Sequence, residues 1–365
     1  MDYYPLIRPL LFRLDAETAH NIALKALHYG LAPRKKISEK NNSLLSQKIW
    51  DIPFNNPVGM AAGFDKNAQV IAPLARQGFG FVEAGTVTPK PQKGNPKPRL
   101  FRLEEDEAII NRFGFNNAGS TPFLERLNKW KNKRTNPRYR QCVLGANIGK
   151  NKSSPNTPDD YLTLLREVYG LCDYITVNIS SPNTPGLREM QSEDALDALL
   201  KALMKLRDEL RDSWQLHTPL LVKIAPDNDD EALNKIAQLA LLHKIDGLII
   251  SNTTIGLRAD LKNQTLANEP GGLSGKPLLD LSTNALSKMH NFTGGEIPLI
   301  GVGGISNGDD AYQKIKAGAS LIQIYSTIIY QGFSVIDEIN NTICSNLQAD
   351  GFSNISQAIG ADHRQ

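Results

Sequence analysis

Short apolar runs alternate with amphipathic stretches along the chain downstream of residue 55. Eight such runs occupy residues 58–63, 79–85, 142–148, 174–179, 220–225, 247–251, 299–304 and 320–325. Leucines at helical spacing follow Ser192, and a similar stripe follows Asp229 and Asp230. Buried strands that alternate with helices favour a parallel sheet with right-handed crossovers, and eight such units predict a (β/α)8 barrel. A doubly wound open sheet is the alternative.

Two insertions interrupt this alternation. Residues 87–117 are too long for an ordinary strand-to-helix connection and contain two strand-like segments, so they predict a small hairpin over the rim of the barrel. Residues 255–276 end in a glycine-bearing stretch, EPGGLSGKPL, which favours a loop that can act as a lid.

The first part of the chain, residues 1 to about 40, predicts a helical extension to a catalytic domain of residues 41–365. Leu6, Ile7, Leu10, Leu11 and Leu14 recur at helical spacing, and a second helix is expected to begin near Asp15. Arg8 and Arg13 interrupt the apolar run well short of a membrane-spanning length. Periodicity alone leaves open whether these helices lie on a membrane surface or dock on the domain.

Composition excludes several classes of protein. The 365 residues are 41% hydrophobic, which is enough for a large core, and 41 basic against 38 acidic residues give a net charge of +3. So balanced a charge does not favour a nucleic-acid partner. Cys142, Cys172 and Cys344 are widely spaced, which favours packing residues in a reducing compartment over disulfides or a zinc site.

A barrel places its chemistry at the carboxyl ends of its strands, and the unusual residues of this chain lie there. Lys66 follows the first run, and Lys223 lies within the fifth, where a buried ammonium needs an anionic or polar partner. Lys223 fits Schiff-base chemistry, a fixed charge beside an electron-rich cofactor ring, or a structural ion pair. The stretch GVGGISNG and the YST that begins at Tyr325 are placed to hold a phosphate, with Gly304 and Ser326 as candidates.

Amides are the second unusual feature of this rim. Five asparagines, which both donate and accept hydrogen bonds, suit a flat neutral ligand with imide edges; they are Asn111, Asn147, Asn178, Asn183 and Asn252. Ser180 and Ser181 lie between two of them in VNISSPNTPGLR (177–188). Serine and proline are both unfavourable in a strand interior, because serine competes for backbone hydrogen bonds and proline cannot donate one. No histidine follows any strand, so an acyl-transfer hydrolase is disfavoured and a serine would have to accept a proton without imidazole.

Nine segments together resemble the dihydroorotate dehydrogenase family over nearly the whole chain. They read VNISSPNTPGLR, AAGFDKN, KGNPKPRLFRL, NRFGFNN, GANIGKN, SNTT, GGLSGKPL, GVGGI and IYS. The resemblance implies FMN at the carboxyl end of the barrel and oxidation of dihydroorotate to orotate in pyrimidine synthesis. Serine at position 181, the helical extension and the lack of iron–sulfur cysteine spacing indicate the quinone-linked, membrane-associated class.

The resemblance also implies a set of site residues. The FMN contacts are Ala62, Gly63, Lys66, Thr86, Asn147, Asn178, Lys223, Ser251, Gly275, Gly304, Tyr325 and Ser326. The orotate contacts are Lys66, Asn111, Arg112, Phe113, Gly114, Phe115, Asn178, Asn183, Asn252 and Thr253. The quinone site comprises His20, Arg102 and Tyr325. Ser181 is the catalytic base, with Thr184 as a relay, while Ser180 is expected to point to the other side of the strand.

The implied partners are dihydroorotate and orotate, a membrane quinone and the membrane surface. Because no transit peptide precedes MDYYPLIRP, we expect a peripheral protein on the cytoplasmic side of the cell inner membrane. Three alternatives stay open, namely an FMN barrel dehydrogenase for another pyrimidine, an aldolase built on Lys223 and an inactive binding module.

Overall fold

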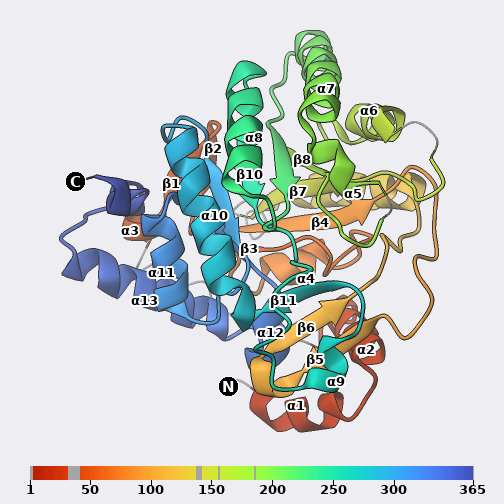
Figure 1. Ribbon diagram of the computed structural model, residues 1–365, viewed down its shortest axis with the longest axis vertical. Coiled ribbons are helices and arrows are strands. Elements are labelled where there is room, and N and C mark those ends of the chain that lie inside the picture. Colours follow the sequence, from red (N-terminus) through yellow and green to blue (C-terminus); the bar gives the residue numbers. More distant parts are fainter. Residues whose placement is uncertain (1–2, 32–41, 137–141, 155–156, 185, 365) are drawn as a thin grey trace.

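Eight parallel strands close into a barrel, in the order β10-β12-β13-β3-β4-β7-β8-β9 (Figure 1). The computed structural model describes residues 3–31, 42–136, 142–154, 157–184 and 186–364. The barrel strands are β3 (Val58–Met60), β4 (Phe81–Val87), β7 (Val143–Ile148), β8 (Tyr174–Asn178), β9 (Leu220–Ile224), β10 (Gly247–Ile250), β12 (Leu299–Val302) and β13 (Ala319–Ile324). Each predicted run overlaps one of them, so the (β/α)8 barrel is confirmed and the open sheet is wrong.

Helices surround the barrel and bury the stripes that the sequence predicts. They are α4 (Ile71–Ala75), α5 (Ser120–Lys133), α6 (Thr157–Val168), α7 (Glu193–Trp214), α8 (Asp230–Leu242), α10 (Leu279–Phe292), α11 (Gly308–Lys316) and α13 (Val335–Ala349), with the short α3 (Asn42–Leu45), α9 (Gln264–Ala267), α12 (Ser326–Gln331) and α14 (Ile355–Ala358). Leu199 and Leu203 of α7 are fully buried. Asp229 caps α8 by accepting a hydrogen bond from the amide of Ala232.

A hairpin and an aromatic cluster close the amino-terminal end of the barrel. The hairpin consists of β1 (Gln47–Ile49) and β2 (Ile52–Phe54), which pair antiparallel. Phe54 packs edge-on against Phe81, with 5.7 Å between ring centroids, and both join a cluster with Tyr174 and Leu321. Because this end is filled with side chains, the open rim lies at the carboxyl ends of the strands.

Both insertions meet over that rim. Residues 87–117 contain the predicted hairpin, made of β5 (Leu100–Leu103) and β6 (Ala108–Asn111). Residues 255–276 were expected to form a loop, but Gly272–Gly275 is a strand, β11, that pairs with β6. The two insertions therefore form one three-stranded sheet, β11-β6-β5. This part of the second insertion is a strand because its backbone pairs with β6, which is distant in the sequence. The local glycine content indicates only a loop.

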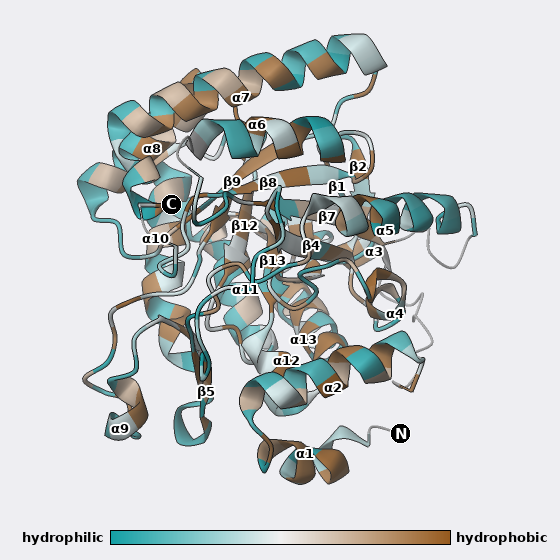
Figure 2. Cartoon of the chain, turned by 90° about the vertical axis from the view of Figure 1, so that its right-hand side faces the viewer, coloured by the Kyte–Doolittle hydropathy of each residue, from teal (hydrophilic) through white to brown (hydrophobic). Residues whose placement is uncertain are grey.

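The N-terminal extension forms two helices beside this small sheet (Figure 1), α1 (Tyr4–Phe12) and α2 (Ala16–His28). Asp15 is the predicted start of the second helix and caps it by accepting a hydrogen bond from the Thr18 amide. No residue of α1 is buried, and Leu6 and Leu10 are 75% and 62% exposed. Figure 2 shows α1 at the edge of the molecule, with much of its ribbon in the colour of hydrophobic residues.

Among the helices that the structure describes, none combines the length and hydrophobicity of a transmembrane span. The predicted boundary between residues 40 and 41 touches residues 32–41, which lie outside the described part of the chain.

Candidate active site

One cavity opens at the carboxyl ends of the barrel strands, beneath the three-stranded sheet. Of the residues predicted to contact FMN, those that line it are Ala62, Gly63, Lys66, Thr86, Asn178, Lys223, Ser251, Gly275, Gly304, Tyr325 and Ser326. Of those predicted to contact orotate, the lining residues are Lys66, Asn111, Phe113, Gly114, Phe115, Asn178, Asn252 and Thr253. The barrel thus brings the two predicted groups to one place, as the convergence of strand ends requires.

Lys223 supplies a positive charge to the floor of the cavity. Its side chain projects from β9 inside the barrel and is only 5% exposed. It makes no hydrogen bond or ion pair with any residue that the structure describes. Burial lowers the pKa of Lys223, and the nearby carboxylate of Glu83 acts in the opposite direction. A buried ammonium with its hydrogen-bonding capacity unused is suited to an electron-rich ligand.

Glu83 lies below the cavity and organises the layer under the floor. This fully buried carboxylate on β4 accepts hydrogen bonds from Asn147 Nδ2 (2.7 Å), Tyr174 OH (2.9 Å) and Gln323 Nε2 (2.9 Å). Asn147 belongs to this layer and does not line the cavity. It reaches the cavity through Thr86, whose hydroxyl donates to Asn147 Oδ1 at 2.6 Å.

Gln323 is a lining residue that the sequence analysis missed. Its amide nitrogen is held by Glu83, while its buried Oε1 has no hydrogen-bond partner among the described residues. An unpartnered buried acceptor beside a cavity fits the N–H group of a ligand. The signal was a glutamine inside the apolar run SLIQIY, the same kind of signal that identified Lys223.

Amide side chains surround the upper part of the cavity. Asn178 Nδ2 donates to Thr86 Oγ1 at 3.1 Å, and Asn252 Nδ2 approaches Asn178 Oδ1 at 3.3 Å. Asn183 lies outside the lining and donates to the backbone carbonyl of Asn111 at 3.1 Å. The five predicted asparagines therefore form two hydrogen-bonded groups, one of Asn147, Asn178 and Asn252 and the other of Asn111 and Asn183.

Two cationic residues near these asparagines have different environments. Lys66 Nζ lies 4.0 Å from the centroid of the Phe113 ring. Burial lowers the pKa of Lys66 to about 8, so the side chain is largely charged at neutral pH. Arg112 does not line the cavity, because its guanidinium pairs with Glu269 at 2.6 Å.

Ser181 lies in the loop after β8 and is 6% exposed. Its hydroxyl accepts a hydrogen bond from the backbone N–H of Asn183 at 3.3 Å. Ser181 is not among the residues that line the cavity. The buried hydroxyl of Thr184 has no hydrogen-bond partner in the described part of the chain. Ser180 differs from Ser181, because its hydroxyl donates to Asn178 Oδ1 at 3.1 Å and accepts from Asn252 Nδ2 at 2.9 Å.

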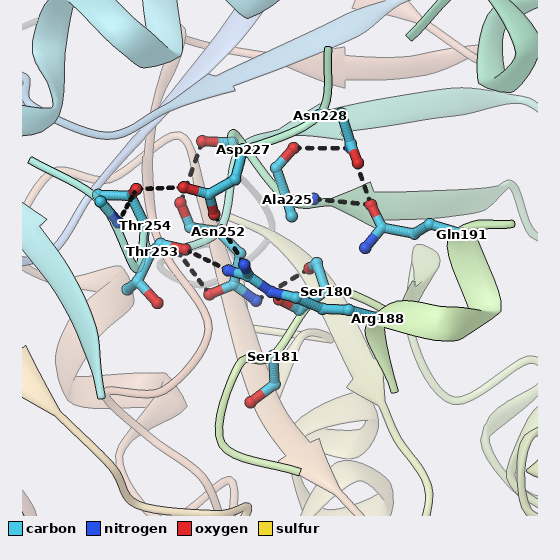
Figure 3. A network of polar contacts seen from close by, with 12 residues as sticks. Ser180, Ser181, Arg188, Gln191, Ala225, Asp227, Asn228, Asn252, Thr253 and Thr254 are labelled. Atoms are coloured by element: carbon cyan, nitrogen blue, oxygen red, sulfur yellow. Dashed lines mark hydrogen bonds and ion pairs between the residues drawn. The ribbon is translucent and has the colours of Figure 1, made fainter. Parts of the chain in front are cut away.

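Arg188 ties the Ser181 loop to two other strand ends (Figure 3). Its guanidinium pairs with Asp227 after β9 at 2.8 Å and donates to the carbonyls of Thr253 (3.0 Å) and Ser180 (3.4 Å). The Thr254 hydroxyl donates to the same Asp227. Figure 3 shows the Ser181 hydroxyl pointing away from this network, as expected from the alternation of side chains.

The residues predicted to line a quinone site lie where the N-terminal helices meet the cavity wall. His20 packs on Phe64 and Tyr325, with ring centroids 5.3 Å and 6.4 Å apart, and Tyr325 lines the cavity. Burial and the charge of Lys66 lower the pKa of His20 to about 3, so this imidazole is neutral. Arg102 lies over the Phe12 ring and donates to the backbone carbonyls of Leu11 (3.2 Å) and Phe12 (3.0 Å) at the end of α1.

Comparisons with known proteins match this arrangement. The family model for dihydroorotate dehydrogenase matches residues 44–347. The dihydroorotate dehydrogenase (quinone) of Azorhizobium caulinodans is 46% identical over 364 residues, which cover 100% of both chains. The mitochondrial dihydroorotate dehydrogenase (quinone) of Oryza sativa is 46% identical and covers 98% of this chain and 80% of its own. A crystal structure of DHODH from Eimeria tenella in complex with ferulenol shows a TM-score of 0.92 at 42% identity, covering 96% of both chains.

We expect Arg188→Met to loosen the Ser181 loop, because the ion pair and both carbonyl contacts are lost together. Amide hydrogen exchange should become faster for residues 179–184, 186–192 and 253–254, while the barrel strands keep their protection. Arg134→Met, which breaks the ion pair with Asp173 on the barrel exterior, is the matched control and should leave these amides unchanged. Unaltered exchange in the Arg188 variant would contradict this role.

Proposed function

Since the chain belongs to the dihydroorotate dehydrogenase family, we propose that it oxidises dihydroorotate to orotate, a step of pyrimidine synthesis, and passes the electrons to a quinone. The cavity carries this proposal, because it combines a buried lysine that has no partner among the described residues with hydrogen-bonded asparagine side chains at the carboxyl end of the barrel. The quinone-linked relatives align with the chain nearly end to end. Family membership does not support an aldolase or an inactive binding module.

The cofactor that we propose is FMN, held by the lining residues assigned to it above, with Asn147 behind Thr86. Lys223 fits the electron-rich edge of its ring, and Gln323 Oε1 fits a ring N–H. Gly304 and Ser326 fit the phosphate, where Gly304 has a φ of 81° and a Cβ would lie 2.2 Å from the Cα of Leu279. When bound, FMN supplies the hydride acceptor and the store of electrons for the quinone.

Dihydroorotate carries one carboxylate and presents an imide edge, and its product orotate is flat. The substrate side of the cavity offers groups that match these features. Asn111, Asn178 and Asn252 present amides, and Lys66 presents a positive charge. Asn183 and Arg112 lie behind these residues and support them through the Asn111 backbone and the loop of residues 111–115. We propose that this set orients the ring so that one face meets Ser181 and the other meets the hydride acceptor.

Ser181 is the proposed base for the ring carbon that loses a proton while its neighbour loses a hydride. A serine hydroxyl is a poor proton acceptor at neutral pH, so its own proton has to leave as the substrate proton arrives. The Thr184 hydroxyl, which has no partner among the described residues, is the proposed next group of this relay, and it passes its own proton on to an ordered water. Burial of both hydroxyls excludes bulk water from the step.

The quinone is proposed to reach the site between α1 and α2, past His20, Arg102 and Tyr325. The exposed leucines of α1 fit the apolar part of a lipid surface, and the quinone acceptor named for the relatives is a membrane molecule. We propose peripheral attachment through this helix pair, on the cytoplasmic side of the cell inner membrane.

Lys223→Met should remove FMN from the protein or block its reduction, because the variant loses the positive charge of Lys223 while keeping the apolar length of the side chain. The measurement is the FMN released per chain, followed by reduction of any retained flavin with dihydroorotate. Lys201→Met, on the exposed face of α7, is the control. A fully yellow and fully active Lys223 variant would refute the assignment.

Ser181→Ala should slow reduction of the bound flavin by roughly 10²- to 10⁴-fold while orotate still binds, since a positioned base contributes about that factor. Ser181→Cys should restore part of the rate, more so at high pH, where the thiolate forms. Ser180→Ala should mainly weaken substrate binding, because Ser180 holds Asn178 and Asn252. The measurement is stopped-flow reduction of the bound flavin. A larger loss of rate in Ser180→Ala than in Ser181→Ala would show that Ser181 is not the base.

Leu6→Ser/Leu10→Ser should reduce binding to phospholipid vesicles and turnover with a long-tailed quinone. Both side chains are largely exposed and contribute apolar surface without supporting the core. Reduction of the flavin by dihydroorotate should not change. Leu242→Ser is the control, because Leu242 is 69% exposed on α8, outside the N-terminal helices. Equal vesicle binding by the double variant and the control would contradict the membrane role of α1.

A further inference from the structure

Glu17 lies near the start of α2, and its carboxylate is buried. It is 7% exposed and pairs with Arg99, which is also 7% exposed. The contact is bidentate, with Arg99 Nε 3.0 Å from Glu17 Oε2 and Nη2 2.7 Å from Oε1. Such a pair is geometrically specific, and loss of one partner leaves a buried charge uncompensated.

The remaining nitrogen of the Arg99 guanidinium closes a turn in the first insertion. Arg99 Nη1 donates to the carbonyls of Lys93 at 2.7 Å and Asn95 at 2.9 Å. The three nitrogens of this side chain are therefore all engaged, some by α2 and some by the turn of residues 93–99. Glu17 fixes the guanidinium, and the guanidinium fixes the turn.

The same turn supports residues predicted to bind the substrate. The backbone N–H of Asn95 donates to the Phe113 carbonyl at 3.0 Å. The side-chain Nδ2 of Asn95 donates to the backbone carbonyls of Arg112 (2.9 Å) and Asn183 (3.4 Å). The Arg112 amide donates to the Arg99 carbonyl at 2.9 Å. One turn thus holds both the 112–114 segment and the loop that carries Ser181.

The charges of Glu17 and Arg99 also act on a residue that lines the cavity. The Phe113 ring is close to two cations, with Arg99 Cζ 5.5 Å and Lys66 Nζ 4.0 Å from its centroid. Burial is the main cause that lowers the pKa of Lys66, while Glu17 raises this pKa and Arg99 lowers it.

We propose that Glu17 is a positioning residue for dihydroorotate, which acts through Arg99 and the 93–99 turn on residues 112–114 and Asn183. The inference rests on the proposed function and deepens it. It gives the N-terminal extension a second role beside membrane contact, because α2 then sets the geometry of the substrate face. The N-terminal extension and the residues proposed to bind the substrate are therefore connected by hydrogen bonds, although they are distant in the sequence.

Glu17→Gln tests this positioning role, because glutamine keeps the size of the side chain and removes the charge that holds Arg99. Orotate affinity is measured in the FMN-containing protein from the change in the flavin spectrum on titration. We expect affinity to fall roughly 3- to 30-fold, the range for residues that act on a site through others. The KM for dihydroorotate should rise by a similar factor, while reoxidation of the reduced protein by a short-tailed quinone keeps its rate.

Asp15→Ala is the matched control within the same helix. It removes the cap of α2, a hydrogen bond of 2.9 Å from the Thr18 amide, and leaves the Glu17–Arg99 pair in place. It should lower the melting temperature without weakening orotate binding. A loss of affinity as large in Asp15→Ala as in Glu17→Gln would reduce Glu17 to general support of the helix and overturn the proposal.

A second variant covers the case in which Glu17→Gln does not fold. Asn95→Ala removes the side chain that reaches Arg112 and Asn183 from a partly exposed position, and it should weaken orotate binding in the same direction. In the double variant the two losses should be less than additive, because both act through one turn. Unchanged orotate affinity in Asn95→Ala, or in a folded Glu17→Gln, overturns the proposal. A wild-type protein that fails to bind orotate would instead contradict the proposed function.

Discussion

A carboxylate at the centre of a closed barrel is the constraint on which the site depends. Glu83 is fully buried, and a charge there is tolerable only if its oxygens are hydrogen-bonded and a counter-charge is near. Asn147, Tyr174, Thr176 and Gln323 donate to it from three other strands, and Lys223 supplies the positive charge. The layer beneath the cavity is thereby rigid, and the groups that face the cavity inherit its geometry.

Above this layer, chain segments that do not belong to the barrel complete the cavity wall. The first insertion, the second insertion and the N-terminal helices meet there, joined by the β11-β6-β5 sheet, the Glu17–Arg99 pair and Arg102. Arg188 performs the corresponding task for the Ser181 loop, by joining it to the ends of β9 and β10. The loop that carries Ser181, the proposed base, is thus held in place by long-range contacts, which favours a fixed orientation of its hydroxyl.

The sequence predicted the elements that local rules govern. Short apolar runs located all eight barrel strands, two strand-like segments located the β5–β6 hairpin, and Asp15 and Asp229 marked the starts of α2 and α8. Lys223 was identified because a lysine in an apolar strand is costly without a partner. The same rule applies to Glu83 and Gln323, which lie in equally apolar runs and were overlooked.

The sequence by itself determined the barrel, its rim and most of the polar residues gathered there, because periodicity, capping and strand order act over a few residues or follow from chain order. Tertiary structure alone decided the pairing of those residues. Glu17 and Arg99 are 82 positions apart, Glu83 and Gln323 are 240 apart, and β11 joins β6 across 161 residues from Gly272 to Asn111. No local pattern specifies such partners, since closure of the barrel and docking of the helices bring them within hydrogen-bonding distance.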